Sequence, residues 1–190
     1  YYHVISSDSD LVTSPTLFSK DSIMFQNEFR KVGKNFNLIT NFGYVKDYKS
    51  TNQNKKKNIN YIFSKLDYDL NLENFNSSKL YFDIEKTTND TFLKVFDTNL
   101  IENSTSLKPK NQNTLSSELK LILNNEKYNL TTGFISSENL QLRNNDRYQY
   151  VLPYYNFDRS IFTNFNNGSI NFQSSGSNEL IETNKLKSKI

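Results

Sequence analysis

Two pairs of carboxylates are the residues of this sequence whose types and spacing could support catalysis. Asp67 and Asp69, and likewise Asp83 and Glu85, stand two residues apart, so on a strand each pair would share one face. A glycosidase could use two carboxylates placed in this way, but no aromatic sugar-binding platform or supporting motif accompanies either pair. The one histidine, His3, lies at the terminus of the chain, which argues against a Ser-His-Asp site. We therefore predict no catalytic residue and no enzymatic activity.

Cofactor, metal and nucleic-acid sites are not indicated either. The chain has no cysteine, so it can form neither an internal disulfide nor a thiolate metal site. It contains no glycine-rich phosphate loop and no His/Cys metal set. A net charge of +3 with scattered lysines is too weak a bias for nucleic-acid binding. We expect no cofactor, no metal and no nucleic acid as a partner.

The elements that carry the charged residues are predicted from the alternation of apolar and polar side chains. From Ile23 to Arg30 the odd positions are mainly apolar and the even positions mainly polar. Successive side chains on a strand point to opposite faces, so such a segment has one apolar and one polar side. Two environments require this pattern: a soluble sheet packed on a core, or a barrel wall between lipid and water.

The whole chain predicts an all-β fold of about ten meandering antiparallel strands without a helix of useful length. The expected strands lie near residues 8–18, 22–32, 36–47, 58–70, 79–88, 114–124, 127–137, 147–158, 169–175 and 180–190. The apolar share of 35% and the mean hydropathy of −0.71 are low for a compact soluble core, while 14% aromatic residues argue against disorder. No apolar run approaches the roughly 18–20 residues of a spanning helix.

Strand length and loop length favour the barrel wall over a soluble sandwich. Strands of soluble sheets average about 5–6 residues, whereas tilted membrane strands need about 9–11, and most of the expected strands are of the longer class. Connections 33–35, 71–78 and 125–126 are short, whereas 49–57, 89–113 and 138–146 are longer. The two kinds alternate along the chain, as periplasmic turns and external loops do in outer-membrane barrels. Six tyrosines near expected strand ends would suit the lipid–water interface: Tyr44, Tyr48, Tyr68, Tyr81, Tyr128 and Tyr148.

Three segments of the chain resemble, in family order, the barrel of the lipopolysaccharide-assembly family LptD. The first opens with Tyr1-Tyr2, passes through Asp8-Ser9-Asp10 and a strand that contains Pro15, and ends at Glu28-Phe29-Arg30. The second is Thr88-Asn89-Asp90-Thr91-Phe92-Leu93, followed by Phe96-Asp97. The third is Arg147-Tyr148-Gln149-Tyr150-Val151-Leu152-Pro153-Tyr154-Tyr155.

The resemblance implies a part of the outer-membrane translocon of a Gram-negative bacterium, which inserts lipopolysaccharide into the outer leaflet. The implied partners are lipopolysaccharide, outer-membrane lipid, the plug lipoprotein LptE and the periplasmic Lpt bridge. Residues 1–190 are then expected to be the N-terminal part of a larger transmembrane β-barrel domain. The family's periplasmic jelly-roll domain, which would meet the bridge, and the remaining strands are missing. The cysteines that join the two domains in many members are also missing, so disulfide-controlled assembly is not implied.

The resemblance further implies a lateral gate at the first strand, where a seam opens for the acyl chains of the lipid. Thr13, Ser14 and Pro15 are the candidate gate residues. Proline has no N–H, so Pro15 removes one ladder hydrogen bond and would weaken the closing seam. An ordinary edge-strand proline would occupy the same place.

Charged residues on the polar faces of the strands are expected to face the lumen, because charge against lipid is costly. There they could keep a hydrated path for phosphorylated sugars, or simply pair across strands. The expected lumen-facing residues are Glu28, Arg30, Lys65, Asp67, Asp69, Asp83, Glu85, Glu118 and Lys120.

Two alternative functions stay open on the sequence. A soluble secreted β-sandwich binding module would show the same alternation, but it would fold alone in buffer, whereas a barrel segment would need detergent. Another outer-membrane barrel, such as a porin or a receptor, would share the wall without the lipopolysaccharide gate.

Overall fold

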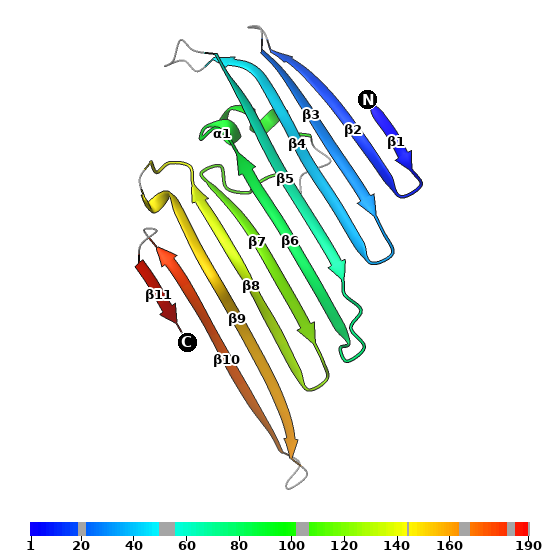
Figure 1. Cartoon of the computed structure of the whole chain (residues 1–190), viewed down its shortest axis with the longest axis vertical. Coiled ribbons are helices and arrows are strands. Elements are labelled where there is room, and N and C mark those ends of the chain that lie inside the picture. Colours follow the sequence, from blue (N-terminus) through cyan, green and yellow to red (C-terminus); the bar gives the residue numbers. More distant parts are fainter. Residues whose placement is uncertain are drawn as a thin grey trace. The chain divides into compact units, whose positions relative to one another are not determined.

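The structure is a computed structural model that describes residues 1–18, 22–49, 56–101, 107–143, 145–163, 168–181 and 185–189. In this part of the chain, eleven strands hydrogen-bond to one another in chain order, from β1 to β11 (Figure 1). The registers of β1–β2, β2–β3, β3–β4, β8–β9, β9–β10 and β10–β11 are all antiparallel. The prediction of an all-β antiparallel meander is therefore confirmed.

Most strands are long, as the sequence predicts. Nine of the eleven described strands have 10 to 16 residues, and only β1 and β11 have 5. The strands are β1 (Tyr2–Ser6), β2 (Ser9–Phe18), β3 (Ser22–Val32), β4 (Phe36–Lys49), β5 (Lys56–Asp69), β6 (Ser77–Thr87), β7 (Thr114–Asn124), β8 (Tyr128–Asn139), β9 (Tyr148–Thr163), β10 (Gly168–Ile181) and β11 (Lys185–Lys189). Between them lie a short helix, α1 (Phe92–Phe96), and the 3-10 turns η1 (Asp97–Asn99) and η3 (Asn145–Arg147).

The chain divides into two compact units. Unit 1 comprises Tyr1–Leu66 and Asp83–Leu115, and unit 2 comprises Asp67–Phe82 and Ser116–Ile190. Strands β5, β6 and β7 each contribute residues to both units.

In unit 1, strands β2 to β4 separate side chains into two faces. Their register is continuous, because Pro15 pairs with Phe25 and Phe25 pairs with Tyr44. Alternation places Phe25 and Tyr44 on one face, here called the apolar face. Glu28 and Arg30 lie on the opposite face, here called the charged face.

A small core lies on the charged face of unit 1, where α1 packs against the strands. The ring of Phe92 stacks on Tyr61 of β5 at 4.8 Å, and Phe96 makes edge contacts with Phe18 and Tyr48 at 5.5 and 5.6 Å. Phe92, Leu93 and Phe96 are buried, as the apolar character of connection 89–113 suggests. The other buried apolar residues of this unit are Met24, Val45, Ile59, Phe63, Leu100, Leu107 and Leu115.

Unit 2 has the same two kinds of face. Tyr128, Phe157 and Phe172 form a row of rings across β8, β9 and β10, with centroids 6.0 and 6.2 Å apart. Phe172 is 53% exposed, so this row is not covered by a second layer. On the charged face, the Tyr154 hydroxyl donates a hydrogen bond of 2.6 Å to Glu118.

The strand predictions hold in the middle of the chain and fail near its ends. Strands 22–32 and 114–124 have the predicted bounds, and the others from β4 to β8 differ by two residues or fewer. The expected strand 8–18 corresponds to β2, and the separate strand β1 before it was not predicted. The expected strands 169–175 and 180–190 are also wrong at their bounds: β10 continues to Ile181 and β11 begins at Lys185. In agreement with the prediction of no helix of useful length, the one α-helix of the described residues, α1, has only five residues.

The connections in the structure alternate in length only in the middle of the chain. The β3–β4, β5–β6 and β7–β8 connections are short, whereas β6 and β7 are separated by residues 88–113. Residues 50–55, within the expected long loop 49–57, lie outside the described residues. Tyr48, Tyr128 and Tyr148 lie at strand ends as expected, but Tyr81 lies in the middle of β6.

Candidate membrane wall and gate strand

The charged face of unit 1 holds ion pairs between neighbouring strands. Arg30 of β3 donates from Nε to Asp10 of β2 at 2.8 Å, and the same nitrogen lies 3.9 Å from Glu28, whose side chain is almost completely buried. Lys65 of β5 lies 3.7 Å from Asp83 of β6. Four of the predicted lumen-facing residues therefore take part in charge pairs on one face.

The charged face of unit 2 is organised in the same way. Lys79 of β6 lies 3.8 Å from Asp69 of β5, and Lys120 lies 3.2 Å from Glu118 on β7. The Lys120 ammonium also sits 5.4 Å from the centre of the Tyr81 ring. Each half-exposed pair contributes little to stability, so their main effect is to keep this face polar.

The members of the two carboxylate pairs have different surroundings in the structure. Asp69 and Asp83 each face a lysine, Asp67 is exposed and Glu85 is half-buried. Among the described residues there is no group of three or more His, Cys, Asp or Glu side chains that could hold a metal ion.

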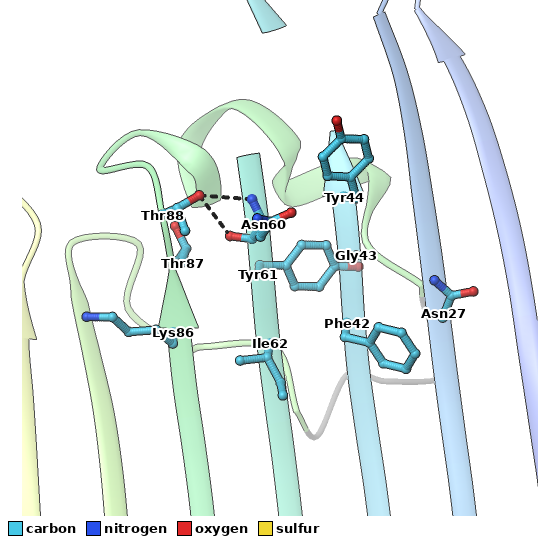
Figure 2. Close-up of a pocket in the computed structure, with 10 residues that line it drawn as sticks. All are labelled: Asn27, Phe42, Gly43, Tyr44, Asn60, Tyr61, Ile62, Lys86, Thr87 and Thr88. Carbon is cyan, nitrogen blue, oxygen red and sulfur yellow. Dashed lines mark hydrogen bonds between the residues drawn. The ribbon is translucent and has the colours of Figure 1, made fainter. Parts of the chain in front are cut away.

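The apolar face of unit 1 carries charge only near strand ends. On β2 to β5 and the unit 1 part of β6, its charged side chains are Lys31, Lys46, Lys56 and Lys86, and it has no carboxylate. On β4 this face has no charged side chain from Phe36 to Tyr44, but Lys31 of β3 pairs with Leu38 and Lys86 lies at the level of Phe42 and Ile62 (Figure 2). The charge on this face of unit 1 is therefore that of lysines, without a carboxylate.

Large apolar side chains stand exposed on the apolar face of each unit. Leu17, Phe25, Phe42 and Ile62 are 38–78% exposed. In unit 2, Phe82, Leu119, Phe134 and Ile161 are 37–47% exposed. Large exposed apolar patches mark interaction sites for a protein partner or a membrane.

A groove on the apolar face of unit 1 was not predicted from the sequence. It has a volume of about 460 Å³ and is lined by residues of β3, β4, β5 and β6 together with Thr88 (Figure 2). Phe42 and Ile62 form its apolar part, and Lys86 is the one charged residue among those that line it. The available signal was that Lys86 interrupts an otherwise uncharged face of its strand.

Two glycines allow tyrosines to lie flat against the charged face. A Cβ atom on Gly43 would lie 2.3 Å from the Tyr61 ring, and one on Gly133 would lie 2.9 Å from the Tyr154 hydroxyl. Tyr61 also donates a hydrogen bond of 2.8 Å to buried Asn41. The rings therefore bridge adjacent strands in each unit.

The candidate gate residues lie on β2, which is the second strand rather than the first. Strand β1 pairs with the part of β2 from Ser9 to Val12. The Tyr1 terminal amine donates to the Thr13 carbonyl at 2.7 Å, and the Thr13 N–H donates to the Tyr1 carbonyl at 2.8 Å. Within the described residues, no strand pairs with this side of β2 beyond Thr13.

The direction of the Thr13 N–H locates the donor that Pro15 lacks. Alternate residues of an antiparallel strand direct their N–H groups to the same neighbour. The Pro15 nitrogen therefore faces away from β3, on the side where β2 has no neighbour beyond Thr13. Pro15 therefore costs no β2–β3 hydrogen bond, because the donor that it lacks would point away from β3.

The turn before β2 is held by short polar contacts. The Ser6 hydroxyl donates a hydrogen bond to the Asp8 carboxylate and also contacts the Ser9 hydroxyl. The Ser6 hydrogen bond holds the pKa of Asp8 below its ordinary value. The negative charge of Asp8 is therefore favoured at the end of β2.

Comparison with known proteins does not identify the family of this chain. No protein-family model matches the chain, and no similar sequence was found among curated proteins. In the described residues, no helix has the length and apolar character needed to span a membrane.

Proposed function

We propose that this chain is part of the wall of an outer-membrane β-barrel, with the apolar face of each unit towards lipid and the charged face towards the aqueous lumen. The observation that carries the proposal is the separation of charge by face in unit 1. The ion pairs of Arg30 and of Lys65 with Asp83 lie on one face, while the other face carries exposed apolar side chains and no carboxylate. Placing Arg or Lys on a lipid-facing wall at mid-depth would cost about 2–4 kcal/mol.

Within this wall, we propose that β2 is the gate strand of a lipopolysaccharide translocon of the LptD type. The three segments in family order support this assignment, and so does Pro15 on β2, whose missing donor would point away from β3. Acyl chains would leave through the seam beside β2 while the sugars travel along the charged face. LptE, the periplasmic bridge and the missing strands would complete the assembly in a Gram-negative outer membrane.

The wall is tested with two neighbouring residues of β6, since the chain contains no Trp and each variant would hold a single one. The chain carrying Phe82→Trp or Tyr81→Trp is refolded into vesicles that contain brominated lipid. We expect bromine to quench the Trp at position 82 and iodide to quench the Trp at position 81. Equal quenching at both positions, or a chain that stays monomeric in buffer without binding vesicles, would contradict the wall and favour a soluble sandwich.

The translocon is tested in the bacterium that makes the protein, with a photo-crosslinking residue at Ser14 of β2 or at Asn129 of β8. Both positions lie on the charged face, so the Asn129 variant controls for general access of lipopolysaccharide to the lumen. We expect adducts with lipopolysaccharide mainly at position 14, and a loss of these adducts when export is blocked. A wall that passes the Trp test without such adducts would indicate a porin or a receptor.

A further inference from the structure

Helix α1 is joined to three strands of unit 1 by contacts between aromatic rings. Phe92 stacks on Tyr61 of β5, and Phe96 makes edge contacts with Tyr48 of β4 and with Phe18 of β2. The ring centroids of the two Phe96 contacts are 5.6 and 5.5 Å apart, within the range of favourable aromatic pairs. Phe96 is only 3% exposed. The last residue of α1 is therefore a buried link between β2 and β4.

The backbone of β4 is shaped for its part of this link. Tyr44 points to the apolar face, and strict alternation would send Tyr48 to the same face. Asp47, however, has a φ of 58°, in the left-handed region that residues other than glycine adopt uncommonly. This interruption of the extended backbone turns Tyr48 to the charged face, where its ring meets Phe96.

The other part of the link reaches the segment of β2 that has the fewest neighbours. Among the described residues, β2 beyond Thr13 pairs only with β3. Alternation from Ser14 places Phe18 on the charged face, and there it meets α1. The contact between Phe18 and Phe96 is thus a second attachment of this segment, on the side that the proposed function assigns to the lumen.

We infer that α1 is a latch that holds β2 in the closed position of the seam, with Phe18 and Phe96 as its positioning residues. The inference rests on the proposed function, because it requires a seam beside β2 that opens. A strand that moves outwards, towards lipid, leaves the face on which α1 lies, so the ring of Phe18 separates from Phe96. Tyr48 takes no part in this movement, because β4 stays paired between β3 and β5.

The test compares Phe18→Ala with Tyr48→Ala in the bacterium that makes the protein, each combined with the photo-crosslinking residue at Ser14. Both variants remove one edge contact with Phe96, but only the first releases β2. We expect Phe18→Ala to increase the lipopolysaccharide adducts at position 14 about two- to tenfold, the equilibrium effect of one aromatic pair. Tyr48→Ala should leave the adducts unchanged, and so should Phe18→Tyr, which keeps the ring.

A reversible tether gives a second measurement that does not depend on losing a ring contact. The chain has no cysteine, so Phe18→Cys with Phe96→Cys supplies the only pair within it that a short, reducible bifunctional thiol reagent can link. This link should stop lipopolysaccharide export until it is reduced, because β2 can no longer leave α1. Tyr48→Cys with Phe96→Cys places the same link between α1 and β4, and export should continue.

The outcomes separate the latch from a structural role and from the proposed function. Equal adducts in Phe18→Ala and Tyr48→Ala, or tethers that affect export alike, would overturn the latch. The amount of folded protein in the outer membrane is measured in each variant, since a merely structural role of Phe18 would lower it without raising the adducts per folded chain. If the chain without these changes gives no adducts at position 14, the gate of the proposed function fails instead.

Discussion

At Gly43 the backbone of β4 lies in direct contact with the ring of Tyr61. A methyl group there would come within 2.3 Å of the ring and 2.6 Å of the Phe25 carbonyl oxygen. Tyr61 in turn stacks on Phe92 of α1, so one glycine positions the ring that joins the strands to the small core. The absence of a side chain at Gly43 therefore allows the Tyr61 ring to lie against β4.

Gly43→Ala should therefore destabilise the folded chain by about 1–3 kcal/mol, the usual cost of overpacking. The measurement is urea unfolding of the chain in detergent micelles, followed by tyrosine fluorescence because the chain lacks Trp. The double variant with Tyr61→Ala should lose less stability than the two single variants together, because the methyl group would meet one obstacle instead of two. Additive losses would show that the Tyr61 ring does not oppose the methyl group.

At the scale of elements, the sequence predicts those strands whose alternation is continuous and misses those that depend on a partner. The bounds of β3 and β7 follow from alternation alone. In β1, Val4 and Ile5 are adjacent apolar residues, and the strand is defined by its pairing with β2. In β10, the segment Ser174-Ser175-Gly176-Ser177 has no alternation, so its continuity comes from pairing with β9.

The candidate site was predictable in part for the same reason. The charged residues of one face can be identified from alternation, and their pairing across strands was one of the two roles considered for them. The groove needs the register of four strands, which local sequence does not specify. The contribution of α1 is also tertiary, because a five-residue helix has too few turns to show a period.

The helix α1 should be held to the wall by its buried aromatic residues. Phe92→Ala removes a side chain with no exposed surface that stacks on Tyr61, and we expect a loss of about 3–5 kcal/mol. Val95→Ala, at a residue that is 44% exposed on the same helix, is the control and should cost less than about 0.5 kcal/mol. Limited proteolysis near residues 92–99 measures the difference, and equal protection in both variants would contradict the packing.

The strand β2 should form a stronger edge when Pro15 regains an N–H. In Pro15→Val the new donor would point away from β3, towards any strand that closes the seam. One added hydrogen bond of about 0.5–1.5 kcal/mol should slow lipopolysaccharide export and increase crosslinking across the seam. Thr13→Val, which leaves the backbone donors unchanged, is the control. Export and crosslinking at the normal level in Pro15→Val would show that the proline does not weaken a gate.

At the scale of the whole molecule, each unit has one face with many charged residues and one with many exposed apolar residues. The second face still carries some cations, such as Lys86 in unit 1 and Arg159, which pairs with Tyr128 and Phe172, in unit 2. A soluble sandwich would cover such a face with a second sheet, whereas here Leu119 and Phe134 stand 37% and 47% exposed. The exposed apolar face therefore needs an apolar environment outside the sheet to cover it.

Substituting one lysine on either face should show that the two faces differ in the cost of a charge. Leu119→Lys, on the apolar face of β7, should cost about 2–4 kcal/mol in a bilayer if the position lies near mid-depth. Thr131→Lys, on the charged face of β8, makes a comparable addition and should be tolerated. The refolded fraction in vesicles at increasing urea measures both, and equal costs would show that the two faces do not meet different solvents.

The pairing of every strand with its neighbour in sequence has a consequence for how the protein reaches its native state. Hairpins such as β3–β4 and β9–β10 close over only a few residues, so they can form rapidly and provide an edge on which the next strand pairs. The turn-rich segment between β6 and β7 must close a much longer chain, at a larger entropic cost. The packing of Phe92 and α1 against the strands is then a late step of folding. Chains that have not completed this step would expose the apolar residues of the small core to chaperones.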